Sequence, residues 1–587
     1  MLGLNKSSCF SEAKRSSYGF GTPYSVPKRN SVGSQSRSKI RVSNCGVNSH
    51  PITDAGGIFH CADPVSNVSD RMQVNFALEC LKWAEKTPDI AAIGSEEHGT
   101  FSYGWLAEQA KRFGNVLLRL GVRRGDRYLC FLPNIPETAA AFLGGQLIGA
   151  VPVMVFLGYK EKELEHVFRN ADAELVITTA ECRASIERIS AKCGPANVLL
   201  VDGATDELPS FSQLMSEAPS DLSPVLTNAD EIAEIIFTSG TTGAPKGIPH
   251  THANVVRQCQ ITASSAWAGI GPGDVVYTSA PIAFAIGLHC HIHYCFYTGA
   301  RSLYCTERPS PQRFLELVEK YGVTHIMTSA AQLWKVLSIR PQPQRVKSIK
   351  SILVGGSPVT ADLAKEWYEA YGYTLQPSLA MTETLGVSCG TRVGEGRPDT
   401  LGKPLPGWQA KIVDPDDRDG RRVVMTGETG VLWLKGATVL PFYWNDQHLT
   451  EEKIRDGWLN TGDLVYEDED GYLHHVGRID ELIKSSGWRI SPIEIEDVLR
   501  EHPWVDDVAV VGISDRHKGQ AVVAVVVPSK PVNDEPALVD ELKKFARERL
   551  AGYKVPERLV FRGNLPKTAT GKVQRKHLSD ALSELGA

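Results

Sequence analysis

A loop rich in glycine and hydroxyl residues follows a short apolar stretch of the sequence and contains one lysine. The apolar stretch covers residues 232–237, and the loop is Thr238-Ser239-Gly240-Thr241-Thr242-Gly243-Ala244-Pro245-Lys246-Gly247. Glycines let backbone N–H groups converge on an anion, hydroxyls donate further hydrogen bonds, and Lys246 adds a positive charge. The loop lacks the Walker pattern, in which glycine directly precedes the lysine. Taken alone, it fits either a phosphate-binding loop or an ordinary glycine-rich turn.

Four further motifs follow this loop and contain residue types that nucleotide chemistry needs. They are Met381-Thr382-Glu383-Thr384, Asn460-Thr461-Gly462-Asp463, Gly477-Arg478-Ile479-Asp480 and Pro566-Lys567-Thr568-Ala569-Thr570-Gly571-Lys572. Carboxylates suit Mg²⁺ and accept hydrogen bonds from hydroxyls, whereas Arg478 and Lys572 bring positive charge to phosphate. A single acid or lysine is usually a solvated surface group. The order of the motifs therefore carries more weight than any one of them.

Together, the five motifs resemble those of the adenylate-forming enzymes, which include acyl- and aryl-CoA synthetases, peptide-synthetase adenylation domains and luciferases. The resemblance covers about residues 75–580. It implies an acid–thiol ligase that uses ATP and Mg²⁺ to convert a carboxylic acid into an acyl-adenylate, with release of pyrophosphate. Coenzyme A then takes the acyl group as a thioester. A large N-terminal domain and a small mobile C-terminal domain are also implied.

The resemblance further implies which residues bind the nucleotide. The phosphates would be held by Thr238, Ser239, Gly240, Thr241, Thr242, Gly243 and Lys246, and the adenine region by Gly355, Gly356, Ser357, Ala380, Met381 and Thr382. Glu383 would bind Mg²⁺, Asp463 would accept both ribose hydroxyls, and Arg478 would donate to ribose and phosphate. The family commonly has Tyr-Gly where this chain has Leu379-Ala380, so the ring expected to stack on adenine is missing.

Catalysis is assigned by the same resemblance to Lys572, Glu383 and Thr238. Negative charge builds up as the carboxylate attacks the α-phosphate, and the ammonium group of Lys572 would stabilise it. Asp480 matches the family's hinge, about which the small domain would rotate so that Lys572 leaves and a CoA-binding segment enters. That segment contains Lys484, Ser486, Gly487 and Trp488.

The acyl pocket is expected along residues 281–288, which align with the family segment that lines it. Where 4-coumarate ligases show Phe-His, this chain has Ala283-Phe284, and the run through Gly287 is similar to benzoate and 2-aminobenzoate CoA ligases. An apolar slot for a small aromatic or alicyclic acid is therefore expected, unless Phe284 only packs. The segment has no aspartate to pair with an α-ammonium group, which disfavours amino-acid substrates.

Three alternatives stay open. The first is a short- or medium-chain fatty acyl-CoA synthetase. The second is an acyl-AMP ligase that loads a separate acyl carrier protein. The third is a degenerate nucleotide-binding protein without turnover, which the Leu379-Ala380 replacement motivates and the intact acidic and basic groups of the motifs oppose.

A histidine-rich segment invites a metal-binding interpretation. His289, His291 and His293 are followed by Cys295. On a helix His289 and His293 share a face while His291 points away, so at most a partial zinc set would form. A local packing cluster beside the acyl pocket is the favoured interpretation.

Short apolar runs bounded by turn residues lead to these motifs, with helical patterns between several of them. They cover residues 128–132, 151–156, 175–178, 198–201, 232–237, 275–279, 324–328 and 351–354. Their alternation predicts an α/β fold of parallel sheets covered by helices. From about residue 400 the strands are separated by glycine and proline, which predicts a β-rich subdomain. We therefore expect an N-terminal adenylation domain at 70–477.

A last α+β unit is expected after the hinge, at 481–587. Helical patterns cover 492–501 and 536–550, and strand patterns cover 505–512 and 521–528.

Composition excludes several classes of protein. The 587 residues are 42% hydrophobic and 22% charged, with a net charge of -5, so neither wholesale disorder nor nucleic-acid binding is expected. The 12 cysteines form no CxxC pair, which favours a reducing compartment. The longest uncharged stretch, 138–159, is interrupted by glycine and proline, so we expect a buried helix and strand and no integral membrane segment. No oligomeric state is predicted.

The first fifty residues differ from the rest. They hold eight Lys or Arg, one acid and twelve serines. This composition is typical of an organelle transit peptide, which would place the protein in a plastid or mitochondrial matrix or stroma. A disordered extension is the alternative, and the protein would then be cytoplasmic.

Overall fold

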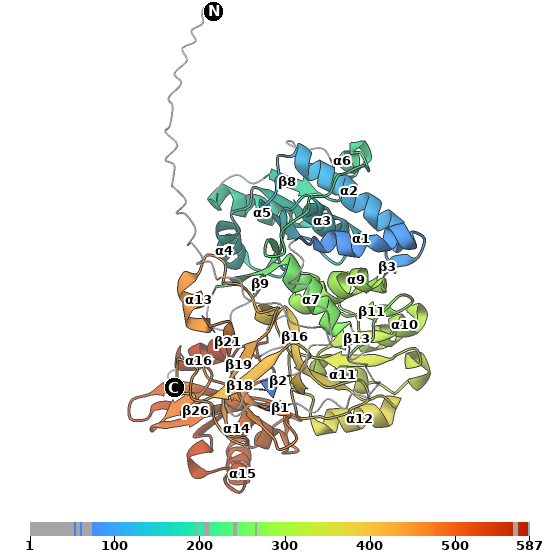
Figure 1. The fold of residues 1–587 in the computed structure, drawn as a ribbon. Helices are drawn as coiled ribbons and strands as arrows, with labels where there is room; N and C mark the ends of the chain where they lie inside the picture. Colours follow the sequence, from blue (N-terminus) through green and yellow to red (C-terminus); the bar gives the residue numbers. More distant parts are fainter. Residues whose placement is uncertain are drawn as a thin grey trace, which may run out of the picture. The chain divides into compact units, whose positions relative to one another are not determined.

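Helices and strands alternate along most of the chain that the computed structural model describes, which is residues 52–53, 59–60, 73–193, 197–204, 210–238, 244–263, 267–567 and 573–584 (Figure 1). Their order confirms the predicted α/β fold. The apolar runs form strands because their β-branched and aromatic residues are buried on both faces. None of the described helices is long and apolar enough to cross a bilayer.

A six-stranded sheet carries the glycine-rich loop at one of its edges. Its order is β10-β9-β6-β5-β7-β8, and all its pairs are parallel except β9 with β10. The strands are β5 (Arg127–Phe131), β6 (Val151–Met154), β7 (Leu175–Thr178), β8 (Asn197–Leu200), β9 (Ile232–Thr238) and β10 (Lys246–Thr251). Its associated helices include α3 (Pro136–Leu147), α4 (Glu161–Ala171) and α5 (Ala180–Cys193). The uncharged stretch thus forms the buried helix α3 and strand β6, as predicted.

A nine-stranded sheet carries the methionine-threonine-glutamate motif. Its order is β17-β16-β15-β14-β13-β11-β12-β3-β4. The strands are β3 (Ala91–Ser95), β4 (Gly99–Ser102), β11 (Val275–Tyr277), β12 (Arg301–Tyr304), β13 (His325–Thr328), β14 (Ser351–Val354), β15 (Gln376–Met381), β16 (Gly386–Gly390) and β17 (Lys403–Pro404). The central pairs, from β15 across to β3, are parallel. Helices α10 (Pro311–Tyr321), α11 (Ala330–Leu337) and α12 (Ala361–Tyr371) pack against it through one apolar core.

Several helices belong to the large core that includes parts of both sheets. They are α1 (Phe76–Lys86), α2 (Tyr103–Arg119), α6 (Phe211–Glu217), α7 (His252–Thr262), α8 (Ala285–Leu288), the π-helix η2 (His289–Tyr294) and α9 (Cys295–Thr298). The last three are continuous. The three histidines thus lie on a helix, whose central turn has π geometry that the sequence pattern did not indicate.

A seven-stranded antiparallel sheet forms the predicted β-rich part. Its strands are β1 (Ile52–Thr53), β2 (Phe59–His60), β18 (Gln409–Val413), β19 (Gly430–Lys435), β20 (Ile454–Arg455), β21 (Trp458–Glu467) and β22 (Leu473–Arg478). Strand β2 pairs with β18, so residues before position 70 contribute to this sheet. The short helix α13 (Gln447–Lys453) precedes β20.

The last unit is a five-stranded sheet with helices on both faces. Its strands are β23 (Ile483–Ser485), β24 (Trp488–Ile490), β25 (Val505–Asp515), β26 (Gly519–Pro528) and β27 (Arg558–Phe561). Helices α14 (Pro492–Arg500) and α15 (Glu535–Arg547) cover one face, and α16 (Arg575–Glu584) covers the other. The two predicted helices and two predicted strands are present, with boundaries that shift by at most three residues.

Candidate functional site

The two ends of the glycine-rich loop are held together by a β-hairpin. Thr238 ends β9, Lys246 begins β10, and the two residues are register partners in the antiparallel pair. Both side chains are half-buried. The intervening residues Ser239, Gly240, Thr241, Thr242 and Gly243 lie outside the described residues. The hairpin therefore fixes where the loop begins and ends.

A second segment packs against this hairpin. The backbone N–H of Trp444 donates to the carbonyl of Gly247 at 2.9 Å. A Cβ at Gly247 would lie 2.9 Å from Cβ of Trp444, so a larger residue at position 247 would push the two segments apart. The segment that contains Tyr443 and Trp444 is thereby held beside the loop.

The Thr382-Glu383-Thr384 turn is held at all three of its carbonyl groups. His250 Nε2 lies 2.7 Å from the Thr382 carbonyl, the N–H of Leu440 donates to that of Glu383 at 2.8 Å, and Thr438 Oγ1 donates to that of Thr384 at 2.9 Å. These three tertiary bonds fix the backbone of the turn that carries the Glu383 side chain.

The hydroxyl of Tyr443 is the polar group beside that carboxylate. It donates to Glu383 Oε1 at 3.4 Å. Burial, and then the negative charge of Glu383, raise the pKa of Tyr443, so its hydroxyl stays protonated and serves as a donor. Tyr443 therefore connects the glutamate to the segment packed on the hairpin, and sequence reasoning had given it no role.

The residues expected around adenine follow two adjacent strands. Gly355, Gly356 and Ser357 come after β14, and Ala380 and Met381 end the neighbouring parallel strand β15. A Cβ at Gly355 would meet Ser378 Oγ of β15 at 3.4 Å, and Gly356 has a φ of +80°. Glycine thus suits both positions, one because of the approach of a strand and the other because of its backbone angle.

Asp463 and Arg478 form an ion pair across two strands. They are register partners on β21 and β22, and Arg478 Nη1 donates to Asp463 Oδ1 at 2.7 Å. Arg478 Nε also donates to Asp480 Oδ1 at 3.1 Å. Burial alone would lower the pKa of Arg478, but Asp463 and Asp480 raise it above its ordinary value. The guanidinium group therefore joins the predicted ribose ligand to the predicted hinge residue.

The predicted acyl segment is built around a tight turn before α8. Ala283 is buried, and Phe284 is half-buried with its ring 4.5 Å from that of Phe156. A Cβ at Gly287 would lie 1.9 Å from the carbonyl oxygen of Pro281. Because that atom belongs to the backbone, position 287 needs glycine for the turn to form.

The histidines of η2 belong to a buried network. His293 Nε2 lies 2.9 Å from Glu234 Oε2 and its Nδ1 lies 2.9 Å from His289 Nδ1, whereas His291 contacts Ser302 Oγ at 3.0 Å. No group of three or more metal-ligating side chains that could hold an ion occurs among the described residues. Sequence reasoning missed Glu234, although a single carboxylate inside an apolar strand was a visible signal.

The predicted CoA-binding residues lie on the hairpin of β23 and β24. Ser486 and Gly487 have φ of 49° and 83°, as a two-residue turn of this kind requires. A Cβ at Gly487 would meet no atom within 4 Å, so the backbone there is open. Trp488 is exposed and stacks on Tyr553 with ring centroids 4.3 Å apart.

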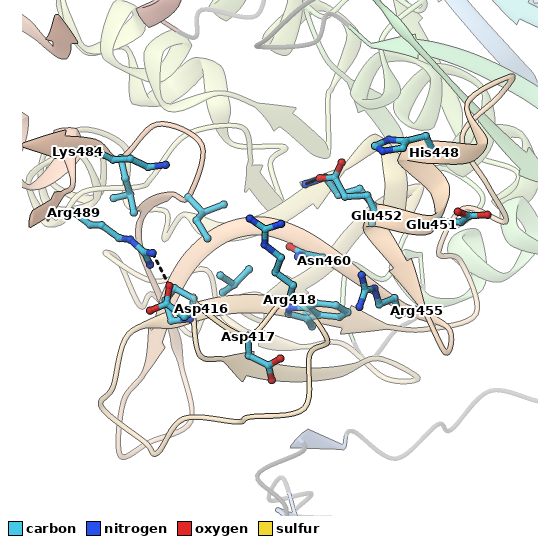
Figure 2. A pocket seen from close by; sticks show the side chains of 16 residues that line it. Asp416, Asp417, Arg418, His448, Glu451, Glu452, Arg455, Asn460, Lys484 and Arg489 are labelled. Carbon is cyan, nitrogen blue, oxygen red and sulfur yellow. Dashed lines mark hydrogen bonds and ion pairs between the residues drawn. The ribbon is translucent and has the colours of Figure 1, made fainter. Parts of the chain in front are cut away.

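A cavity of about 740 Å³ lies beside this hairpin (Figure 2). Lys484 lines it together with Arg489, Arg418 and Arg455, and its acidic groups include Asp416, Asp417, Glu451 and Glu452. Arg489 Nη2 donates to Asp416 Oδ1 at 2.6 Å, which joins β24 to the loop between β18 and β19. Lys484 is thus the predicted CoA-binding residue that lines this charged cavity.

Lys572 lies outside the described residues. The residues that flank it, Lys567 and Val573, pair as a β-bridge, and the N–H of Gln574 donates to the carbonyl of Pro566 at 2.9 Å. These contacts close the loop on which Lys572 stands at both of its ends.

Two family models match the chain. The model described as AMP-binding enzyme matches residues 80–444, and that of the AMP-binding enzyme C-terminal domain matches residues 494–572. The chain is 29% identical to the benzoate–CoA ligase of Thauera aromatica over 490 residues, which cover 83% of this chain and 92% of that protein.

Two further similarities extend over most of the chain. It is 31% identical to the long-chain-fatty-acid–CoA ligase of Salmonella typhimurium over 509 residues, covering 81% of this chain and 89% of the relative. The structure of the anthranilate CoA ligase AuaEII in complex with anthranoyl-AMP superimposes with a TM-score of 0.81 at 26% identity, covering 89% of this chain and 99% of that one.

Proposed function

Because the chain belongs to the AMP-binding enzyme family and is an acid–thiol ligase, we propose that it joins a small aromatic or alicyclic carboxylic acid to coenzyme A. In the first step a carboxylate oxygen attacks the α-phosphorus of ATP, and the bond to the β-phosphate oxygen breaks to release pyrophosphate. In the second, the thiol sulfur of coenzyme A attacks the acyl carbon, AMP leaves, and the thiol proton passes to solvent. A thioester is the product.

The observation that carries this proposal is the way one segment ties together two predicted nucleotide-binding elements, the glycine-rich hairpin and the Glu383 turn. The hairpin that begins and ends with Thr238 and Lys246 contacts Trp444, and the adjacent Tyr443 donates to Glu383. Asp463 and Arg478 pair directly on the next sheet. These contacts support roles in which the loop and Lys246 bind the phosphates.

The remaining nucleotide contacts are proposed from the same elements. Asp463 accepts from the ribose hydroxyls, and Arg478 donates to the ribose and phosphate region. The ends of β14 and β15 flank adenine, with Gly355, Gly356, Ser357, Ala380, Met381 and Thr382. The open backbone at Gly356, where a Cβ would meet no atom within 4 Å, supports close approach of a flat base.

Mg²⁺ fits the residues present at the proposed phosphate site. Glu383 supplies a carboxylate whose oxygen receives one long hydrogen bond from Tyr443, and carboxylate oxygen is a ligand type that Mg²⁺ prefers. When bound, the ion would neutralise charge on the phosphates. The protein's own contribution is the turn at Thr382, Glu383 and Thr384, whose backbone is fixed by three tertiary hydrogen bonds.

Substrate choice is proposed from the segment that carries Ala283, Phe284 and Gly287. The rings of Phe284 and Phe156, tilted by 38° with centroids 4.5 Å apart, offer an apolar surface on which a compact ring would pack. The names of a benzoate ligase relative and an anthranilate ligase neighbour support the same class of acid. The long-chain-fatty-acid ligase relative keeps an aliphatic acid as the second candidate.

The two-domain organisation is also proposed, with an N-terminal adenylation domain at 70–477, a hinge at Asp480 and a C-terminal domain at 481–587. The boundary falls between the end of β22 and the start of β23. Rotation about it would exchange Lys572 for the hairpin that carries Lys484, Ser486, Gly487 and Trp488. The open backbone at Gly487 supports passage of a pantetheine arm.

We further propose that residues 1–50 are a transit peptide that directs the protein to an organelle matrix or stroma. The basic, serine-rich and acid-poor composition of this segment supports the proposal. Fusion of these residues to a fluorescent protein, followed by microscopy in plant and animal cells, tests it. Diffuse cytoplasmic fluorescence in both would contradict it.

The test of the proposed reaction is a mass-spectrometric screen of the full chain with ATP, MgCl₂ and coenzyme A. The panel contains benzoates, cinnamates, alicyclic acids and aliphatic acids of increasing length, and acyl-AMP and acyl-CoA are measured separately. We expect acyl-CoA from aromatic or alicyclic acids. Acyl-AMP without acyl-CoA would instead favour a carrier protein as the acceptor, and ATP binding without turnover of any acid would favour the degenerate binder.

The substitution Phe284→His tests the pocket itself. It introduces a polar ring beside Phe156, so we expect the preference among the acids of the panel to move toward hydroxylated members. The measurement is the ratio of kcat/KM values for paired acids that differ by one hydroxyl group. An unchanged ratio would place the acyl pocket away from this residue.

A further inference from the structure

A chain of buried side chains runs from the π-helix η2 to the proposed magnesium-binding turn. His289, His293 and Glu234 are joined by hydrogen-bond contacts, Glu234 is the cross-strand register partner of His250, and Nε2 of His250 lies 2.7 Å from the Thr382 carbonyl. All four side chains are at most 3% exposed. The proposed nucleotide contacts use none of these four side chains, so a separate reason is needed for so many buried polar groups.

The last contact of the chain fixes the protonation of His250. A carbonyl oxygen can only accept, so Nε2 of His250 must carry the proton that is donated to Thr382. Burial lowers the pKa of His250 to about 4 despite the opposing effect of Glu234, so the ring is neutral and its Nδ1 is an acceptor. That nitrogen has no hydrogen-bond partner among the described residues.

Glu234 is the carboxyl group across the strand pair from this nitrogen, although no hydrogen bond joins the two side chains in this structure. It is the register partner of His250 across β9 and β10, and the two groups are close enough for each to affect the pKa of the other. Its Oε1 also lacks a partner among the described residues, whereas Oε2 faces His293 Nε2 at 2.9 Å. Burial raises the pKa of Glu234 to about 8, so at neutral pH the carboxyl group can donate.

The two histidines of η2 are consistent with hydrogen bonds donated toward Glu234 and His250. Burial lowers the pKa of His293 to about 3 and that of His289 well below its ordinary value, so both rings are neutral. His293 then donates from Nε2 to Glu234 and accepts at Nδ1 from His289. Each donor then points toward Thr382, and once Glu234 donates to His250 the one atom of the four side chains without a partner among the described residues is Nε2 of His289.

We propose that Glu234 is a positioning residue for adenylation, which sets the tautomer of His250 and thereby fixes the Thr382 carbonyl and the Glu383 carboxylate. This inference rests on the proposed function, because it assigns the turn to the binding of Mg²⁺ and ATP. Glu234 itself touches neither the nucleotide nor the acid. Its effect is transmitted through one imidazole ring and one peptide group.

Two substitutions of Glu234 separate this role from other roles. Glu234→Gln keeps the pattern, because the amide N–H₂ donates to His250 and the amide oxygen accepts from His293, so we expect values close to those of the unmodified protein. Glu234→Leu removes the partner of His250 and of His293. We expect the KM for Mg·ATP in adenylation to rise roughly tenfold, which corresponds to the loss of one buried hydrogen bond. Thioester formation from supplied acyl-adenylate should be unchanged.

The matched control is His291→Gln. His291 is a buried histidine of the same helix that contacts Ser302 and takes no part in the set formed by His289, His293, Glu234 and His250. We expect its KM for Mg·ATP to be unchanged. Calorimetric titration of each full-length variant with ATP and MgCl₂, in the absence of any acid, measures Mg·ATP binding without turnover. Thermal unfolding shows whether each variant is folded.

Three outcomes would overturn the inference. A rise in the Mg·ATP KM of Glu234→Gln would show that an ionised carboxylate is required. Equal losses in both half-reactions of Glu234→Leu, or no loss in either, would reduce Glu234 to a packing residue. Mg·ATP binding by the unmodified protein that leads to no acyl-CoA would contradict the proposed function, while the calorimetric comparison of variants would still decide the role of Glu234.

Discussion

Lys572 is the residue on which the proposed division between the two half-reactions depends most strongly. Its substitution by alanine should reduce acyl-adenylate formation at least about a hundredfold, because a charge that stabilises the transition state is lost. Thioester formation from supplied acyl-adenylate should continue. Single-turnover measurements of the two half-reactions give the answer.

The control for that experiment is Lys567→Ala. Lys567 lies five residues earlier and pairs with Asp507 at 2.6 Å on the surface of the last unit, so we expect little change in either half-reaction. Equal loss of both half-reactions in Lys572→Ala would contradict the assignment of this lysine to adenylation.

At the scale of residues, the sequence motifs point to charged groups but not to the buried side chains that contact them. Glu383, Asp463 and Arg478 stand in motifs whose residue order is informative. Tyr443 and Glu234 act through contacts made across strands and sheets, and one sequence does not encode the register that creates such contacts. A carboxylate within an apolar strand is the kind of local inconsistency that deserves a search for its partner.

The tight turn into α8 sets the position of the proposed acyl segment. Gly287→Ala would place a Cβ 1.9 Å from the Pro281 carbonyl oxygen, which can move only with the backbone. We expect a loss of about 2 kcal/mol in the free energy of unfolding, measured by urea denaturation. The kcat/KM for the acid should fall as well, because Phe284 lies on the same turn.

Gly271→Ala is the matched control for that substitution. A Cβ at Gly271 would meet no atom within 4 Å, and its φ is not positive. The change in stability should therefore stay within about 0.5 kcal/mol. Similar losses in the two variants would show that the contact with Pro281 is relieved at little cost.

Elements were predictable from the sequence where burial alone decides them. Strands β7 and β14 match their predicted ranges, because a fully buried strand reads as an apolar run between turn residues. The π geometry of η2 was not predictable, since one extra residue per turn leaves no signature in apolar spacing. The π-helix packs against α7 and β12, which are contacts between elements that one sequence does not specify.

Stability of the whole molecule should depend on pH through Glu467, a buried residue at the end of β21. Burial, and then the neighbouring Asp468, raise its pKa from about 4.5 to about 7 against the opposing effect of Lys403. Between these two values the folded protein keeps a proton that the unfolded chain has lost. The contribution of Glu467 to stability therefore decreases as pH rises through this window.

Glu467→Gln should remove that dependence. We expect the difference in Tm between this variant and the unmodified protein, measured by scanning calorimetry, to favour the variant more at pH 8 than at pH 5. Glu469→Gln, two residues along on the exposed turn, is the control. Its Tm should differ from that of the unmodified protein by the same amount at pH 5 and at pH 8. If the difference in Tm between Glu467→Gln and the unmodified protein is the same at both pH values, the raised pKa assigned to Glu467 is contradicted.

The proposed hinge is where the arrangement of the whole molecule should control the reaction. Arg478 donates to Asp480 as well as Asp463, so a change at position 480 affects both the site and the connection to the last unit. Asp480→Pro fixes φ at this point, and we expect overall acyl-CoA formation to fall roughly tenfold or more while one half-reaction is retained. Asp480→Ala removes the carboxylate and leaves the backbone unrestricted, so it should retain both half-reactions more fully. If proline and alanine give the same rates, or if proline slows the two half-reactions equally, rotation about Asp480 is not what separates adenylation from thioester formation.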